Sequence, residues 1–242
     1  MKAVILLSGG LDSTVALWWA KKRGNYEKIY ALTFTYGSKE EKVTVECTKN
    51  IARLSNIENH LIIDLPWLRE FAYIKGSTLV AEEKQVPKFS GELTNANLSE
   101  TAKSVWIPAR NLCFIAIAAS WAEALGEDVE IVTGFNGEEA RTFPDNSKQF
   151  VERVNSLLKL AVLEVKVKVV APLIDKDKRG ICSLAEELGV PVEYTNSCYE
   201  PQGVNSEGKS IHCGKCESCT RRHRGFIESI GYDKTLYIKN SK

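Results

Sequence analysis

Short runs of apolar residues recur along the chain, each followed by a turn or a helical segment. Their length and their Val, Ile and Leu content are typical of β-strands, and nearly continuous apolar runs suit strands that are buried on both faces. We expect five strands, at residues 2–7, 28–34, 60–65, 129–133 and 165–170. The last run alternates Val and Lys, which suits a half-buried strand near a sheet edge.

Helical patterns lie between these runs, at residues 13–23 and 39–54 and, as one apolar stripe, at 150–161. Residues 111–124 are apolar nearly all round, which indicates a helix that is deeply buried or forms a subunit interface. Strands that alternate with helices predict an α/β fold with a doubly wound, mostly parallel sheet. Residues 76–100 are polar and turn-rich, so we expect a lid or a mobile segment there.

Composition narrows the class of protein. The 242 residues are 44% hydrophobic and 26% charged, and 32 Lys+Arg against 31 Asp+Glu leave a net charge of +1. This is ordinary globular usage without an overall basic field to attract nucleic acid. The first ten residues are too short an apolar run for a signal peptide, and the run 112–119 is far below membrane-spanning length. We therefore expect a cytoplasmic protein without direct nucleic-acid or membrane partners.

The first expected strand ends in Ser8-Gly9-Gly10-Leu11-Asp12-Ser13, directly before an expected helix. Open α/β sheets bind ligands beyond the carboxyl ends of their strands. A helix N-terminus offers unpaired backbone N–H groups and a positive dipole end, and two glycines let a phosphate approach the backbone. Ser8, Ser13 and Thr14 add hydroxyl donors, and Asp12 is a candidate Mg²⁺ ligand. This segment predicts a phosphate site.

Two later segments also resemble phosphate-binding patterns. Residues 203–210 match the Walker pattern G-x-x-x-x-G-K-S. That loop functions only between a buried strand and a helix, and here no strand is expected before it, so we interpret it as a polar turn. The basic run at residues 221–224 suits contact with phosphate or RNA, and it suits a charged helix face equally well.

Seven cysteines without a secretory signal argue against a disulfide framework. Four of them have the spacing C-x14-C-x2-C-x2-C: Cys198, Cys213, Cys216 and Cys219. Four thiolates around a glycine turn favour one tetrahedral zinc ion, with an iron–sulfur cluster or a redox pair as alternatives and His212 as a possible substitute ligand. The others lie in apolar helical patterns and are expected to be inert buried thiols: Cys47, Cys113 and Cys182.

Arg110 lies where the apolar helix begins, after a proline turn. The helix dipole does not favour a cation there, so we expect Arg110 to face a bound phosphate or carboxylate, with a solvated arginine as the alternative. Residues 134–139 and 143–147 follow a strand end and carry polar groups suited to reading a heterocycle. Asp145 or Ser147 would equally serve as a cap for the next helix.

These segments occur together in one known family. Residues 8–13 resemble the pyrophosphate loop of the N-type ATP pyrophosphatases, and together with the four-cysteine tail the chain resembles the 7-cyano-7-deazaguanine synthase family. The resemblance covers nearly the whole chain and includes Phe34–Gly37, Ile107–Asn111, Gly134–Asn136, Phe143–Ser147 and Thr195–Tyr199. Two positions depart from many members, Ser38 in place of Gln and Ala140–Asp145 in place of a longer pattern, and the latter resembles archaeal members.

The resemblance implies that 7-carboxy-7-deazaguanine and ammonia are converted to 7-cyano-7-deazaguanine with two ATP, in queuosine or archaeosine biosynthesis. It implies an adenine nucleotide alpha hydrolase-like domain at residues 1–190, with a small zinc-binding segment at 191–242 packed on it. Catalytic roles then fall on Asp12, Ser13 and Arg110, and the four tail cysteines bind one zinc ion per chain. ATP, with Mg²⁺, is bound by Leu7, Ser8, Gly9, Gly10, Leu11, Asp12, Ser13, Thr14, Val15, Ala16 and Leu17.

Two other functions stay open at this point. A tRNA-thiolating ATP pyrophosphatase would also adenylate an oxygen, but it would then deliver sulfur and would need cysteines that are free of metal. A zinc-ribbon RNA-binding module with a degenerate nucleotide loop is opposed by the near-zero net charge. With no glutaminase-type segment, free ammonia is the expected nitrogen source. The helix at 111–124 makes a homodimer the expected assembly.

Overall fold

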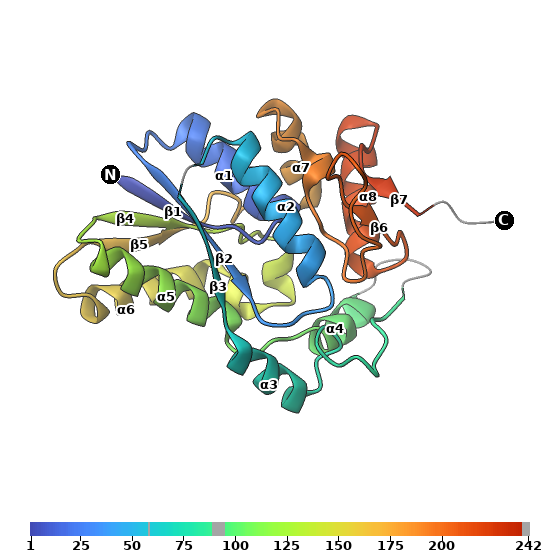
Figure 1. The fold of residues 1–242 in the computed structure, drawn as a ribbon, viewed down its shortest axis with the longest axis horizontal. Coiled ribbons are helices and arrows are strands. Elements are labelled where there is room, and N and C mark those ends of the chain that lie inside the picture. Colours follow the sequence, from blue (N-terminus) through green and yellow to red (C-terminus); the bar gives the residue numbers. More distant parts are fainter. Residues whose placement is uncertain (58, 89–94, 239–242) are drawn as a thin grey trace.

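A five-stranded parallel sheet forms the centre of the computed structural model, which describes residues 1–57, 59–88 and 95–238 (Figure 1). Its order is β3-β2-β1-β4-β5, and every neighbouring pair is parallel. The five predicted strands are confirmed, and the last lies at a sheet edge as expected. They are β1 (Lys2–Leu6), β2 (Ile29–Thr35), β3 (His60–Asp64), β4 (Val129–Val132) and β5 (Val167–Val170).

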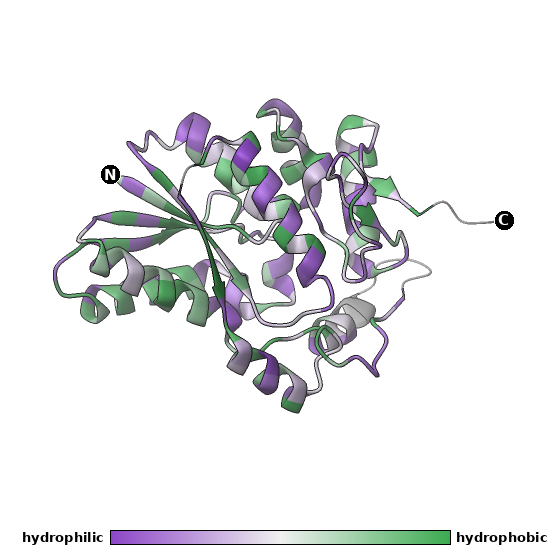
Figure 2. Ribbon diagram, viewed as in Figure 1, coloured by the Kyte–Doolittle hydropathy of each residue, from purple (hydrophilic) through white to green (hydrophobic). Residues whose placement is uncertain are grey.

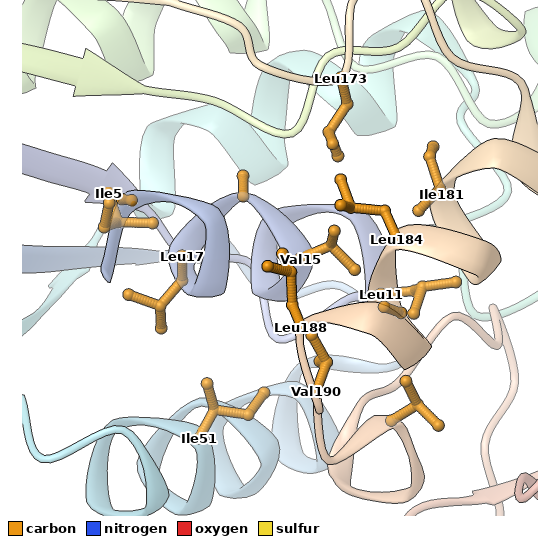
Figure 3. Packing of buried hydrophobic residues seen from close by; sticks show 14 of the residues in the cluster. Ile5, Leu11, Val15, Leu17, Ile51, Leu173, Ile181, Leu184, Leu188 and Val190 are labelled. Atoms are coloured by element: carbon orange, nitrogen blue, oxygen red, sulfur yellow. The ribbon is translucent and has the colours of Figure 1, made fainter. Parts of the chain in front are cut away.

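Alternate residues of the central strands face two different helical layers. Ala3 and Ile5 belong to the cluster beneath α1 (Leu11–Arg23), α2 (Glu41–Leu54) and α7 (Lys178–Glu187). Val4 belongs to the opposite cluster, against α5 (Arg110–Ala124) and α6 (Lys148–Ala161). Figure 2 shows hydrophobic residues along the strands, mixed hydropathy on α1 and α2, and a mostly hydrophobic α5, and Figure 3 shows the first cluster from close by. The doubly wound α/β class is confirmed.

Helix α5 is buried on one side only. Ile115, Ala118 and Ala122 face the sheet and are at most 1% exposed. On the outward side Leu112 is 40% exposed, and Ala116 is also exposed. The first of the two alternatives for this helix, deep burial, is therefore wrong for the single chain. The helix reads as apolar all round because several of its outward positions are apolar.

The segment between β3 and α5 forms a third small core with α3 (Pro66–Lys75) and α4 (Asn95–Ser104). Leu79 and Val80 are at most 4% exposed, and the Leu79 carbonyl accepts the Lys39 N–H at 2.9 Å. These residues are therefore packed in the structure, and the expectation of a lid or mobile segment stays a prediction. The part of that prediction at residues 89–94 lies outside the described residues.

The C-terminal segment joins the main domain through α8 (Glu217–Ile230), whose Phe226 is 2% exposed within the first cluster. A two-stranded parallel sheet of β6 (Ile211–His212) and β7 (Leu236–Tyr237) completes the tail. The tail thus contacts the main domain, while the division into two domains at residue 190 stays a prediction. Among the helices described, none has both the length and the apolar character needed to cross a membrane.

Candidate functional site

The glycine loop joins β1 to α1 at the carboxyl end of the central strand. The sheet order reverses there, because β2 lies on one side of β1 and β4 on the other, and open α/β sheets bind ligands at such a point. Gly9 has a φ of +71°, and an added Cβ would lie 3.0 Å from the Thr44 carbonyl oxygen. A Cβ on Gly134, after β4, would lie 2.7 Å from the Ser13 nitrogen. Close backbone packing therefore requires both glycines.

Hydroxyl groups fix the shape of the loop from inside. The Ser8 N–H donates to Ser13 Oγ at 3.2 Å, and the Thr14 hydroxyl donates to the Gly10 carbonyl at 2.7 Å. The N-cap of α1 is Gly10, which has no side chain to accept the first N–H groups of the helix. These N–H groups are left for an external anion, as a phosphate site requires.

A buried ion cluster lies beside the loop. Lys178 Nζ donates to the two carboxylate oxygens of Asp12 at 2.9 and 2.8 Å, and it lies 3.6 Å from Glu139 Oε1. Asn136 Nδ2 donates to Asp12 Oδ2 at 3.1 Å. Burial lowers the pKa of Lys178, but the two carboxylates outweigh burial and raise that pKa above its ordinary value. Lys178 is thus a fixed cation next to the phosphate site.

A cavity of about 320 Å³ opens in front of the loop, a volume suited to a small molecule. Ser8, Gly10, Asp12, Lys178 and Asn196 line one region, which offers donors and a cation. Aromatic side chains line the rest, and they are Phe34, Tyr36, Trp106, Phe114, Phe135, Phe143 and Tyr199. The cavity therefore combines groups suited to phosphate with surfaces suited to planar rings.

Arg110 lines this cavity at the N-terminus of α5. Its Nη1 donates to the Tyr36 hydroxyl at 3.1 Å, and the preceding residue, Ala109, has a φ of +51°. Asp145 also lines the cavity. Burial raises the pKa of its carboxyl group, and the charge of Arg110 opposes part of that rise. Arg110 thus lines the cavity, and its contact with a bound phosphate or carboxylate stays a prediction.

The four tail cysteines converge on one point, as their spacing predicted. Their Sγ atoms all lie within 4.8 Å of one another, with Cys216 Sγ 3.4 Å from Cys219 Sγ and 4.0 Å from Cys198 Sγ. A tetrahedral zinc ion with Zn–S bonds of about 2.3 Å would hold its sulfurs about 3.8 Å apart. The Cys213 N–H also donates to Cys198 Sγ at 3.3 Å, which favours a thiolate. The donor set fits a closed four-thiolate metal site.

Comparison with known proteins agrees with this geometry. A family model described as "Queuosine biosynthesis protein QueC" matches residues 2–230. The chain belongs to the QueC family. A 7-cyano-7-deazaguanine synthase of Pyrococcus furiosus is 52% identical over 238 residues, covering 98% of this chain and 96% of the relative. Another, of Methanocaldococcus jannaschii, is 44% identical over 245 residues, covering 99% of this chain and all of the relative, 100%.

A solved 4-thiouridine synthetase–RNA complex with bound ATP aligns with this QueC-family chain at 25% identity and a TM-score of 0.45. The alignment covers 87% of this chain and 47% of that one. A TM-score this low supports no argument about function. The assignment to the QueC family rests on the family model and the full-length relatives.

The structure separates the predicted nucleotide segment of this QueC-family chain into two groups. Six of its residues line the cavity, and they are Leu7, Ser8, Gly10, Leu11, Asp12 and Ser13. Gly9 and Thr14 support the turn, as described above. Val15, Ala16 and Leu17 are fully buried in the first cluster and stabilise α1 from behind. The individual roles in binding ATP stay predictions.

Sequence reasoning missed Lys178, although a usable signal was present. Lys178 is the first residue of α7, after its N-cap Asp177. It is therefore a cation at a helix N-terminus, the same unfavourable placement that drew attention to Arg110. Glu139 and Asn196 lie in segments that the sequence analysis named, but their meeting in one cavity depends on chain segments far apart in sequence.

Other polar segments have structural roles. Arg222 is 1% exposed, and its guanidinium donates to the Thr195 hydroxyl and the Val192 carbonyl, each at 2.7 Å. It holds the segment whose Asn196 N–H donates to the Gly9 carbonyl at 2.8 Å, so the tail supports the phosphate loop. The interpretation of residues 221–224 as an RNA contact is therefore wrong for Arg222. Ser147 accepts the Phe150 N–H as the N-cap of α6.

Proposed function

We propose that this chain acts as a 7-cyano-7-deazaguanine synthase that consumes 7-carboxy-7-deazaguanine, ammonia and two ATP, releasing AMP and pyrophosphate. The observation that carries the proposal is one cavity that joins a phosphate loop to aromatic walls, in a chain that belongs to the QueC family along its length. The product serves queuosine or archaeosine synthesis, and the family description names the former.

The reaction has to overcome the poor electrophilicity of a carboxylate. Attack of the substrate carboxylate on the α-phosphate of ATP would form an acyl-adenylate, from which ammonia displaces AMP to give the amide. Adenylation of the amide oxygen by a second ATP then lets AMP leave as the nitrile forms. The first turn of α1 and the Lys178 ammonium would bind the departing pyrophosphate, and Arg110 would orient the carboxylate. Asp12 is the candidate Mg²⁺ ligand, supported by its place beside the loop.

We propose zinc as the occupant of the four-cysteine site, since the sulfur spacings fit a tetrahedral ion and leave no position for a substrate. The ion would stabilise the tail. His212 lies outside this donor set, because its Nε2 accepts the Ser197 N–H at 3.0 Å. Its role is to hold the chain between Asn196 and Cys198 in place.

The two alternative functions are less well supported. A thiolating enzyme needs a reactive thiol, but burial raises the pKa of Cys47 and Cys182 well above the usual range, to about 12 in each case. An RNA-binding module needs exposed cations, whereas Arg221 and Arg222 in the basic run are buried. The cavity is better suited to small-molecule substrates. The free cysteines suit a cytoplasmic protein.

One assay tests the proposed function. The purified chain is incubated with 7-carboxy-7-deazaguanine, ammonium, ATP and Mg²⁺, and products are followed by mass spectrometry. We expect the nitrile to appear with two AMP per molecule, and the amide to appear first. The proposal fails if wild-type protein neither forms the amide nor exchanges labelled pyrophosphate into ATP in the presence of the carboxylate.

We also propose a homodimer that uses the outward face of α5, where Leu112 and Ala116 are exposed. We expect Ala116→Glu to shift the chain from dimer to monomer, because an interface core does not accommodate an unpaired charge. Sedimentation velocity at several concentrations measures the shift. Ser183→Glu, at an exposed position on α7, serves as the matched control and should leave the dimer intact. A wild-type chain that is monomeric at every concentration excludes the proposal.

A further inference from the structure

The proposed reaction requires that protons be removed from the reacting nitrogen, and the phosphate loop offers no group for this. An ammonium ion carries four protons, and the nitrogen of a nitrile carries none. Two protons leave the nitrogen before or during amide formation, and two leave as the amide becomes the nitrile. A general base beside the nitrogen would therefore serve both halves of the reaction, since proton removal by a positioned side chain accelerates such steps by about 10²–10⁴-fold.

Five carboxylates line the cavity: Asp12, Glu40, Glu41, Glu139 and Asp145. Asp12 and Glu139 face Lys178 in the ion cluster. One oxygen of Glu41 accepts both the Tyr36 and the Gly37 N–H groups, at 2.8 and 2.5 Å, which fixes the turn after β2. Asp145 accepts from Asn146 Nδ2 at 3.3 Å. These four acids have partners already.

Glu40 differs from the other four acids. Its Oε2 atom is buried and has no hydrogen-bond partner among the described residues. Burial without a partner is costly for a carboxylate oxygen, so such an atom points to a donor that arrives with the substrate. Glu40 is also held in place, because its carbonyl accepts the Thr44 N–H at 2.9 Å as α2 begins.

Glu40 lines the same cavity as the phosphate loop and lies one helical turn from a residue that packs against that loop. It precedes Thr44 by one helical turn, or about 6 Å along the axis. The Thr44 carbonyl is the group that packs directly against Gly9 of the phosphate loop. Arg110, which we expect to orient the substrate carboxylate, and its hydrogen-bond partner Tyr36 line the same cavity. A substrate carbon held between Arg110 and the loop would therefore have Glu40 beside it.

We propose that Glu40 is the general base that removes protons from the reacting nitrogen in both halves of the reaction, an inference that rests on the proposed function. In the first half, its carboxylate takes a proton from nitrogen as the C–N bond forms, and AMP leaves with the electrons of the C–O bond. In the second half, it takes one proton as the O-adenylated amide becomes the neutral imidate and, after releasing that proton to solvent, it takes the remaining N–H proton. The N–H electrons form the third C–N bond while the C–O bond to AMP breaks. Between the two halves Glu40 returns its proton to solvent.

The electrostatic surroundings suit this role. Burial raises the pKa of Glu40 to about 7, while the Ser38 hydroxyl and the Arg110 guanidinium oppose the rise and the neighbouring Glu41 adds to it. Tyr36 faces the same group, and burial raises the pKa of its phenol, which stays protonated. Asp145 is a second acid in this region, and its negative charge raises the pKa of Arg110. A base with this pKa is largely ionised above pH 7 and protonated below it, so it both accepts and releases protons near neutrality.

The test starts from the amide, 7-amido-7-deazaguanine, so that the ionisation of ammonia does not enter the pH profile. Wild-type conversion of amide to nitrile should rise between pH 6 and pH 8 and then level off. In Glu40→Gln we expect the rate to fall about 10²–10⁴-fold and the inflection to disappear. Exchange of labelled pyrophosphate into ATP with 7-carboxy-7-deazaguanine should persist, because adenylation removes no proton from nitrogen.

Several outcomes overturn the inference while leaving the proposed function in place. If Glu40→Gln loses exchange together with nitrile formation, Glu40 positions the substrate or ATP instead. If the variant raises only the KM of the amide, Glu40 reads the heterocycle. If the pH profile of the variant keeps the inflection seen in the wild type, a residue other than Glu40 is the base. Glu46→Gln, at an exposed position on the same helix, is the matched control and should behave as wild type. If the wild-type chain itself does not exchange labelled pyrophosphate into ATP, the proposed function is refuted.

Discussion

Replacing Asp12 by asparagine should lower the rate of AMP formation by about 10²–10³-fold, the loss found when one preorganised charge is removed from a transition-state site. Asn keeps the size of the side chain and accepts a hydrogen bond from Asn136, but it cannot bind Mg²⁺ as a carboxylate does. Release of AMP from labelled ATP, with 7-carboxy-7-deazaguanine and ammonium present, measures the effect. A variant that turns over normally removes Asp12 from the phosphate machinery.

The same substitution should also lower stability. Lys178 is buried, and with asparagine at position 12 its one charged partner among the described residues is Glu139, at 3.6 Å. Removing one partner of a buried pair costs about 3–5 kcal/mol. At 2–4 °C per kcal/mol for a chain of this size, Tm should fall by about 10 °C.

A double variant separates the two effects of Asp12. Lys178→Met in the Asp12→Asn background removes the unpaired cation, so Tm should recover while AMP formation stays low. If Tm and the rate recovered together, the loss of activity in the single variant would be a consequence of unfolding.

The second large effect concerns the cysteine cluster. Cys216→Ser should lower Tm by about 10 °C or more and reduce the zinc content below one per chain, because a structural zinc site contributes folding free energy directly. Cys216 is the N-cap of α8, where serine is a favoured residue, so the helix itself is not weakened by the change. Thermal unfolding and elemental analysis measure the two effects.

Cys113→Ser is the matched control, since Cys113 lies outside the cluster and, contrary to the expectation of a buried thiol, is half-buried in α5. It should keep its zinc and change Tm little. A strong chelator should reproduce the effect of Cys216→Ser on the wild-type chain. If the metal is removed and the melting curve does not move, the ion does not stabilise the tail.

The strands and the phosphate loop could be predicted because their information is local. Buried strands require unbroken apolar runs, and a loop that turns directly into a helix requires glycines such as Gly9 within a few residues. The metal ligands could be predicted for the same reason, since three of the four cysteines lie within seven residues, 213–219. Burial could not be predicted where it depends on distant neighbours, as for Leu79, which lies in a polar, turn-rich stretch and is buried.

The sequence by itself therefore determined the fold class, the phosphate loop, the four thiolates and, through their combination, the family. Only the tertiary structure decided which charges meet. Lys178 reaches Asp12 across 166 positions of sequence, and Arg222 turns inward to support the segment beside Gly9. Glu40 was left with an oxygen that has no hydrogen-bond partner in the described part of the chain. The physical reason is that these contacts depend on the order of strands in the sheet and on how tightly helices pack. No short stretch of sequence encodes either.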